Sequence, residues 1–562
     1  MLRPLLLAAA LVSPLAPAPA AAQGVAGNYL AARIAGFQND YRAAARYYGR
    51  LVDRADATPQ VLENAVVIFS VLGDFERAAE VGETLERRGQ SSQFGRNAAL
   101  VTALEGGDWD AARAALEEGV GGALLDGLLG AWIAAAEGDA DAAEAAFEAL
   151  AGTAGFEGIA RLHQAYARAA RGDVAGADEI LSGRAFGPLD ATSRGIEAHA
   201  QVLAQLDRRD DALELLDQAI DLSSNPALQD LRARIEAGEP VPYDVVATPV
   251  EGMAEAFFIL AAILSQESSA TFTLLNARAA TVLRPGHVDA LVLVAELLEG
   301  QGEYDLANEA LTAVPRDDPG FFGAEIGRAS VLLASDREEA AVEVLQALTR
   351  SNADRKEVWA AYADALRRLD RHADAVAAYD RAIELDGGEA SETWFWVYAR
   401  GISKEQTGDW PGAEADFRRA LELSPEQPQV LNYLGYGLVE QRQKLDEALD
   451  LIERAVAARP EDGYITDSLG WVLYRLGRFE EAVAPMERAV MLEPLDPIIN
   501  DHLGDVLWAV GREREAEFQW RRALSLAPEP EDESRIRRKL ELGLDAVLAE
   551  EGGVGPTQAA DE

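Results

Sequence analysis

Apolar and small residues recur along this chain at helical spacing, and the helical pattern itself repeats about every 34 residues. Within one unit, Leu469, Gly470 and Leu473 lie at i, i+1 and i+4, which places them on one stripe of a helix. After a break at Gly477, small residues resume on a second stripe that begins at Ala482. The pattern therefore predicts an all-α chain of helix–turn–helix units.

The repeat is clearest in the C-terminal third of the chain. Small residues would let paired helices approach closely, and a proline ends each second helix because it cannot continue one. The positions that step by 34 residues are Leu469-Gly470 and Leu503-Gly504; Ala448, Ala482 and Ala516; Ala455, Ala489 and Ala523; and Pro460, Pro494 and Pro528. A fixed period over several units is the mark of a solenoid.

Weaker copies of the unit continue upstream, where a turn signature of glycine and aspartate precedes a helix. It occurs at Gly73-Asp74-Phe75, Gly107-Asp108-Trp109, Gly138-Asp139 and Gly172-Asp173. The order of residues in each unit resembles the tetratricopeptide repeat (TPR). The resemblance implies a TPR superhelical solenoid of about 14 units in two arrays, six before and eight after a central break.

Composition shifts suggest the domain boundaries. Residues 238–249 hold three Pro and one Gly and cannot continue a helix, so we expect a linker there. This divides the chain into a degenerate N-terminal array at residues 23–237 and a C-terminal array at 250–530. Residues 531–551 are expected to form one amphipathic capping helix, and 552–562 a disordered tail.

The first 22 residues have the features of a secretory signal peptide. Arg3 precedes a short apolar core, prolines follow it, and three alanines end at Ala22, where we predict cleavage. The chain contains no Cys, so a bacterial lipoprotein is not expected. No transmembrane segment is expected either, because the best later apolar stretch, residues 253–264, is too short and carries Glu255. We therefore expect a soluble periplasmic protein.

The charge balance argues against nucleic-acid binding. The chain has 96 Asp plus Glu against 51 Lys plus Arg, a net charge of −45, whereas phosphate backbones attract a positive surface. The five His fall in separate repeats, and the absence of Cys removes thiolate chemistry. We find no nucleophile, phosphate-loop or zinc motif. The sequence thus predicts no catalytic residue, no metal, no cofactor and no enzyme.

In a TPR array, the first helix of each unit lines a concave groove, and this is where we expect a partner polypeptide to bind. Seven of the nine Trp lie after residue 350. We expect Trp410 and Trp520 to pack between helices, but Tyr436, Trp471, Tyr474 and Trp508 to be exposed in the groove. The full set of predicted groove residues is Tyr398, Asn432, Tyr433, Tyr436, Asp467, Trp471, Tyr474, Arg475, Asp501, His502, Asp505 and Trp508.

The chemistry of this set indicates the kind of partner. Aromatic side chains give a large contact area, and asparagine can pair with an extended peptide backbone. The acidic groups favour neutral or basic partner segments. Because the set contains only one Arg and no Lys, a clamp for a terminal carboxylate is not favoured.

The run from residue 394 to residue 526 resembles a family of large exported bacterial TPR proteins. It contains LNYLGYGLVEQ, DGYITDSLGWVLYRLGRFEEAV and DPIINDHLGDVLW. One branch of that family is an envelope adaptor that binds a carboxyl-terminal processing protease and presents cell-wall hydrolases to it. The resemblance implies a non-enzymatic scaffold between such a protease and its substrates. The alternative is an assembly or chaperone-like factor for envelope proteins or export machinery.

Overall fold

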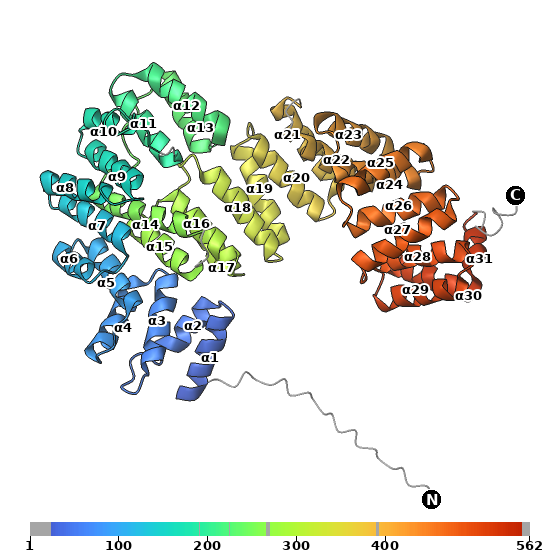
Figure 1. Cartoon of the computed structure of the whole chain (residues 1–562), viewed down its shortest axis with the longest axis horizontal. Helices are drawn as coiled ribbons and strands as arrows, with labels where there is room; N and C mark the ends of the chain where they lie inside the picture. The colour runs from blue at the N-terminus through green and yellow to red at the C-terminus, as the bar shows by residue number, and fades with distance from the viewer. Residues whose placement is uncertain (1–23, 190–191, 224, 266–269, 389–392, 553–562) are drawn as a thin grey trace, which may run out of the picture. The chain divides into compact units, whose positions relative to one another are not determined.

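The computed structural model describes residues 24–189, 192–223, 225–265, 270–388 and 393–552, and all regular structure in these ranges is helical (Figure 1). The predicted signal peptide and almost all of the predicted tail lie outside the described residues. The chain forms two compact units, residues 1–337 and residues 338–562, which we call unit 1 and unit 2. The predicted all-α solenoid is confirmed.

Unit 1 contains helices α1 to α18, and most consecutive helices pack against each other. The bounds are α1 Val25–Phe37, α2 Tyr41–Gly49, α3 Pro59–Val71, α4 Phe75–Arg87, α5 Gln93–Gly106, α6 Trp109–Glu117, α7 Ala123–Ala136, α8 Ala140–Ala151, α9 Glu157–Ala170, α10 Val174–Leu181, α11 Ser193–Gln205, α12 Arg209–Ser223, α13 Pro226–Ala237, α14 Pro249–Ser265, α15 Ala270–Leu283, α16 Val288–Glu299, α17 Tyr304–Thr312 and α18 Phe321–Ala334.

The turn signature read from the sequence explains how successive helices are joined. Gly73 adopts a left-handed conformation (φ 81°), which glycine tolerates without a Cβ clash. The carboxylate of Asp74 then accepts a hydrogen bond from the backbone N–H of Arg77 and caps α4. Phe75 begins α4 and is buried. Asp108, Asp139 and Asp173 cap later helices in the same way.

Residues 238–249 do not separate the two compact units, which differs from the expected linker. The segment breaks the helical pattern as its prolines require, but Val245 and Val246 are buried inside unit 1. The carbonyl of Val245 accepts hydrogen bonds from Arg194 and Arg284. Helix α14 then packs on α7 and α9, and α15 packs on α3 and α5, so both sides of the segment share one core.

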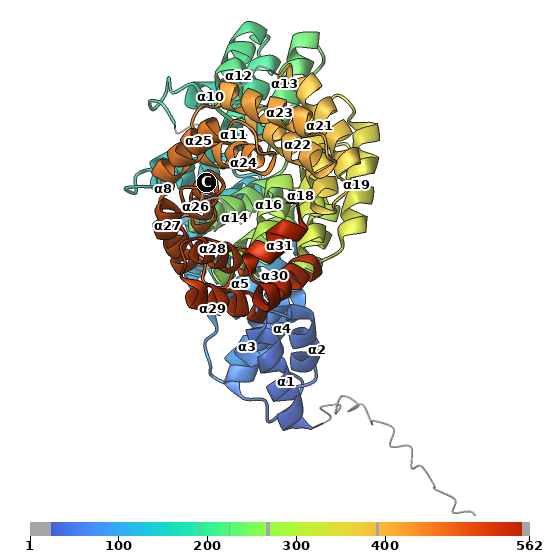
Figure 2. The same ribbon diagram turned by 90° about the vertical axis from the view of Figure 1, so that its right-hand side faces the viewer.

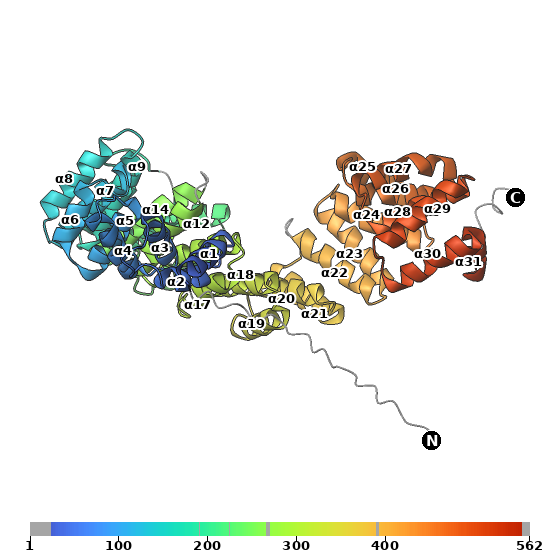
Figure 3. The same ribbon diagram turned by 90° about the horizontal axis from the view of Figure 1, so that it is seen from below.

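Unit 2 contains helices α19 to α31. The bounds are α19 Glu338–Ser351, α20 Lys356–Arg368, α21 His372–Asp386, α22 Trp394–Gln406, α23 Trp410–Leu423, α24 Pro428–Glu440, α25 Leu445–Ala458, α26 Gly463–Arg475, α27 Phe479–Leu492, α28 Pro497–Ala509, α29 Glu513–Ser525, α30 Pro530–Leu542 and α31 Leu544–Glu550. Consecutive helices from α22 to α29 stack in chain order, as Figure 3 shows.

Within unit 2, helices α24, α26 and α28 form the inner row and α25, α27 and α29 the outer row (Figure 2). Small residues allow the two rows to touch. A Cβ on Gly470 would lie 2.5 Å from the Cγ of Met486, and one on Gly504 would lie 2.4 Å from the indole nitrogen of Trp520. Trp410 and Trp520 are buried, which confirms their predicted packing role.

The predicted capping helix is two helices rather than one. Gly543, in a left-handed conformation (φ 84°), separates α30 from α31. Trp508 lies close to this glycine, since a Cβ there would be 2.9 Å from the indole ring. No helix among the described residues is long and apolar enough to span a bilayer.

Candidate functional site

The predicted groove residues lie on four inner helices of unit 2, but the two halves of the set differ in exposure. Tyr398 belongs to α22 and three residues belong to α24, whereas the others lie on α26 and α28. On α24, Tyr433 is exposed and Asn432 and Tyr436 are half-buried. Tyr398 of α22 is only 8% exposed, so, contrary to its predicted place in the groove, it offers little surface to a partner. Most of the predicted residues on α26 and α28 are buried in contacts between neighbouring helices.

An aromatic strip crosses α22 and α24. Phe395 and Tyr433 are 42% and 40% exposed, which is unusual for such large apolar rings. Tyr398 lies beneath them, with its ring centroid 5.5 Å from that of Tyr433 and 6.4 Å from that of Phe395. Tyr436, one turn further along α24, is half-buried. We call Phe395, Tyr398, Tyr433 and Tyr436 the aromatic strip.

Two polar groups accompany the aromatic strip. Asn432 has a buried amide oxygen that accepts no hydrogen bond from any described residue. Burial raises the pKa of the Glu405 carboxyl above its ordinary value. Burial, and secondarily the charge of Glu405, also raises the pKa of Tyr433. The charge of Glu405 therefore acts on the strip, and Asn432 has an unpaired amide oxygen on the same helix as Tyr433.

The prediction that Trp471 and Tyr474 are exposed is wrong. They are only 8% and 9% exposed, because Trp471 is stacked between two rings. Its centroid lies 5.0 Å from Tyr474 and 4.1 Å from His502, with interplanar angles of 15° and 13°. The Trp471 indole N–H donates to Glu440 at 3.0 Å, and Arg475 pairs with the same carboxylate. These contacts join α24, α26 and α28.

His502 and Asp467 form a buried pair beside this stack. The Nδ1 atom of His502 lies 3.0 Å from the nearer oxygen of Asp467. Burial lowers the pKa of His502, but Asp467 more than offsets this effect and the net shift is upward. Both side chains serve the α26–α28 contact and are not available to a partner.

Asp501, Asp505 and Trp508 interact with the C-terminal helices. Lys539 of α30 has a fully buried side chain and donates to Asp501 at 2.7 Å and to Asp505 at 2.7 and 2.8 Å. The Trp520 indole N–H donates to Asp505 at 3.0 Å. The half-buried Trp508 donates to Asp545 of α31. The two aspartates are neutralised within the protein, so they do not form an acidic groove.

Replacement of Trp471 by alanine is expected to destabilise unit 2 by about 3–5 kcal/mol, the usual cost of removing a large buried ring. The matched control is Tyr464→Ala on the same helix, because Tyr464 is exposed. Chemical denaturation followed by circular dichroism measures both variants. Equal stability of the two variants would show that Trp471 is not packed between α24, α26 and α28.

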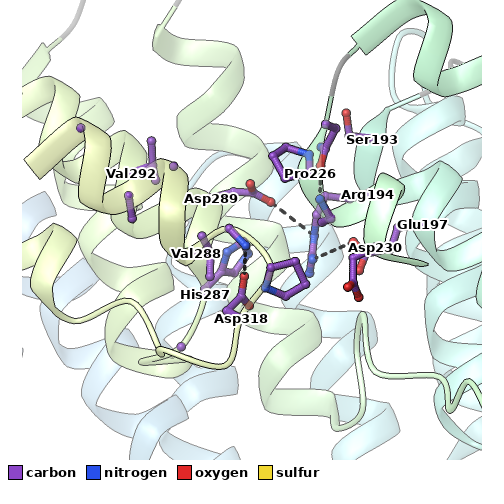
Figure 4. A pocket seen from close by; sticks show the side chains of 18 of the residues that line it. Ser193, Arg194, Glu197, Pro226, Asp230, His287, Val288, Asp289, Val292 and Asp318 are labelled. Carbon is purple, nitrogen blue, oxygen red and sulfur yellow. Dashed lines mark hydrogen bonds and ion pairs between the residues drawn. The ribbon is translucent and has the colours of Figure 1, made fainter. Parts of the chain in front are cut away.

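Unit 1 contains a second candidate region, which sequence reasoning did not select. A cavity of about 720 Å³ lies between α11, α13, α16 and α18 (Figure 4). Beside the cavity, Glu255 of α14 is buried and accepts hydrogen bonds from Arg194, which lines the cavity. The Nε2 atom of His287 lies 3.2 Å from the same carboxylate. Burial opposes ionisation of Glu255, but Arg194 and His287 outweigh it and hold its pKa below the ordinary value.

One signal in the sequence pointed to this region. Glu255 is the single charge within the apolar run of residues 253–264, and a buried charge requires a partner. Its partners, Arg194 and His287, are far away in the chain and are identified only by the packing. Among the described residues, no group of three or more acidic or His side chains is arranged to hold a metal ion.

The stacked helix pairs and the repeat models that match them define an α-solenoid of the protein-interaction class, which is not typically enzymatic. One tetratricopeptide repeat model matches residues 29–92, 398–463, 438–497 and 468–529. Two others match residues 298–365 and 356–388, and together the three cover about half of the chain. The chain is a tetratricopeptide repeat protein, and such proteins generally mediate protein–protein interactions.

A curated relative is the TPR repeat-containing protein PA4667 of Pseudomonas aeruginosa, 28% identical over 159 residues. That match covers 28% of this chain and only 26% of the relative, about a quarter of its length. Among solved structures, the Cut9–Hcn1 hetero-tetramer of APC/C aligns over 93% of this chain and 97% of its own, with 16% identity and a TM-score of 0.38. YrrB, described as a TPR protein with an unusual peptide-binding site, aligns over 35% of this chain and 99% of its own, with 21% identity and a TM-score of 0.28.

Proposed function

We propose that this protein is a non-enzymatic scaffold of the bacterial periplasm that binds a partner polypeptide along the aromatic strip of unit 2. The observation that carries the proposal is the exposure of Phe395 and Tyr433 on consecutive inner helices. Exposed rings of this size, grouped on one surface, are typical of interaction sites. The amide oxygen of the neighbouring Asn432 is buried and unpaired, and rotation of this side chain toward the surface would offer it to a peptide N–H.

The partner segment is expected to be neutral or basic. Glu405 lies beside the strip, and burial penalises its negative charge. A neighbouring cation on the partner would relieve that penalty, because opposite charges favour the ionised carboxylate. The net charge of −45 also favours a basic partner, because it attracts such a partner at longer range and accelerates their encounter.

The finer proposal is an adaptor that brings a periplasmic protease to cell-wall hydrolases. Its support is the resemblance of residues 394–526 to the exported TPR family, together with the signal-like features of residues 1–22. The alternative role, an assembly or chaperone-like factor, would use the same strip for many weakly bound clients. The two roles differ in what co-purifies with the protein.

An affinity pull-down from bacterial envelope extract, with residues 23–562 as bait, tests the proposal. The double variant Phe395→Ala/Tyr433→Ala should reduce recovery of the partner roughly tenfold or more, since truncation of an aromatic anchor commonly costs this much. Phe518→Ala is the matched control, because Phe518 is an exposed ring on the outer helix α29. The Phe518→Ala variant should recover as much of the partner as the unchanged protein does.

Mass spectrometry of the recovered proteins separates the two roles. A protease in a reproducible ratio to the bait supports the adaptor. Many different clients without a protease support the chaperone-like role. Recovery that is the same for the double variant and the unchanged protein would refute the aromatic strip as the binding surface. Fractionation of the producing cells provides the test of periplasmic location.

A further inference from the structure

Unit 1 contains a small pocket that opens beside the 720 Å³ cavity. It has a volume of about 300 Å³ and is lined by α9, α11 and α14. The two spaces have four lining residues in common, namely Ser193, Arg194, Asn225 and Asp289. The two spaces are therefore adjacent, close enough for one bound segment to reach both.

The pocket combines an apolar wall with two unpaired polar atoms. Leu162, Phe258 and Ile259 form much of the wall. His163 and Tyr166 also line the pocket, and the buried Nε2 atom of His163 and the buried hydroxyl of Tyr166 have no hydrogen-bond partner among the described residues. Both side chains are at most 1% exposed. Buried polar atoms nearly always have partners in folded proteins, so two unpaired atoms on residues that line one pocket point to a ligand group that reaches them.

The protonation of His163 follows from its other ring nitrogen. The Trp132 indole N–H can only donate, and it lies 3.0 Å from Nδ1 of His163, so Nδ1 is the acceptor. Burial lowers the pKa of His163 to about 4, and the ring is neutral at pH 7 with its proton on Nε2. His163 therefore carries an unpaired N–H donor on the pocket lining, and the Tyr166 hydroxyl adds a second donor. The matching ligand group is an uncharged oxygen acceptor.

The larger cavity, unlike the small pocket, is suited to a positively charged group. Its lining contains seven carboxylates and three Arg, and the Arg side chains are largely committed to protein groups. Burial, together with Asp244, Asp289 and Glu255, raises the pKa of Glu197 to about 7 against the effect of Arg194. Burial, with a contribution from Asp289, also raises the pKa of Asp318. A cationic side chain in this cavity would relieve the crowding of negative charge.

We infer that unit 1 is a second polypeptide-binding site, which takes a basic segment in the larger cavity and inserts an uncharged, oxygen-bearing side chain such as glutamine between Phe258, His163 and Tyr166. This site goes beyond the proposed function, whose aromatic strip lies in unit 2. The basic residues of the segment pair with Asp289 and Asp318. The inserted side chain accepts hydrogen bonds from His163 and Tyr166.

The test uses residues 23–562 and three fluorescein-labelled pentapeptides with blocked ends: Gly-Lys-Gln-Lys-Gly, Gly-Lys-Leu-Lys-Gly and Gly-Glu-Gln-Glu-Gly. Fluorescence anisotropy measures each Kd at low salt. The Lys–Gln peptide should bind at least tenfold more tightly than the Glu–Gln peptide and several-fold more tightly than the Lys–Leu peptide. No binding of the Lys–Gln peptide, or equal affinity for all three, overturns the inference.

Variants locate the binding within unit 1. Tyr166→Phe removes only an unpaired oxygen, so it should fold normally, weaken the Lys–Gln peptide about tenfold and leave the Lys–Leu peptide within twofold. Asp289→Asn/Asp318→Asn should weaken both Lys peptides equally, whereas Asp53→Asn, at an exposed position of the same unit, should have no effect. Ala262→Phe fills the pocket and should abolish the preference for glutamine. If neither Tyr166→Phe nor Ala262→Phe changes peptide binding, the pocket holds only water and the proposed site is refuted.

Discussion

Replacing Lys539 with methionine is expected to lower the free energy of unfolding of the C-terminal repeat by about 3–5 kcal/mol at pH 7. The side chain of Lys539 is fully buried, and its ammonium donates to both Asp501 and Asp505. Methionine fills a similar volume but leaves two buried carboxylates without their main cation. Arg535, whose nearest contacts with them are 3.7–3.9 Å, compensates only in part.

The matched control for this variant is Lys444→Met. Lys444 also pairs with a carboxylate, that of Glu414, but its side chain is 49% exposed. Exposed pairs contribute roughly 0–1 kcal/mol, so this variant should be nearly neutral. Hydrogen exchange of α28 and α30 amides, together with thermal melting, measures both. Adding Asp501→Asn and Asp505→Asn to Lys539→Met should restore part of the lost stability. Equal destabilisation by the two Lys variants would contradict the buried cluster of Lys539, Asp501 and Asp505.

Gly252→Ala is expected to destabilise unit 1 by about 1–3 kcal/mol through overpacking. A Cβ at Gly252 would lie 2.3–2.5 Å from the ring atoms of Trp132, so α14 and α7 must separate or the indole must rotate. Either movement strains the hydrogen bond from Trp132 to His163, a residue that lines the small pocket. The added methyl group therefore disrupts both the contact between α7 and α14 and this hydrogen bond.

Gly130→Ala, on the partner helix α7, is not expected to destabilise unit 1. A Cβ at Gly130 would meet nothing within 4 Å, and alanine is favoured over glycine in helix interiors by about 0.5–1 kcal/mol. This variant should therefore be neutral or slightly more stable than the unchanged protein. Urea denaturation of the two variants, followed by circular dichroism, measures the difference. A neutral Gly252→Ala would mean that α7 and α14 do not pack as closely as described.

The repeat architecture was predictable because its determinants are local. A left-handed glycine, a capping aspartate and a small residue at the helix contact lie within one unit, and the period repeats them. The course of residues 238–249 was not predictable, since prolines report where a helix stops and not where the chain packs afterwards. Val245 and Val246 are buried by helices that the local sequence does not reveal.

The candidate groove illustrates the same limit at the level of single residues. Tyr436 and Trp471 occupy corresponding positions of consecutive units, yet only Trp471 is sealed by a stacked ring, because His502 follows on the next inner helix. The register correctly places the residues on the inner helices, while the exposure of each depends on its neighbour. The cluster around Glu255 combines residues separated by 61 and 32 positions, which no periodic pattern encodes.

The buried lysine also constrains how this chain can gain or lose repeats during evolution. Exact deletion of α28 and α29 would bring Lys539 onto α26, where the residues 34 positions before Asp501 and Asp505 are Asp467 and Trp471. One carboxylate would be lost, and an indole would occupy the place of the other. Duplications that preserve the last repeat next to α30 keep both aspartates under the lysine. Growth of the array is therefore tolerated more readily in its interior than at its C-terminal end.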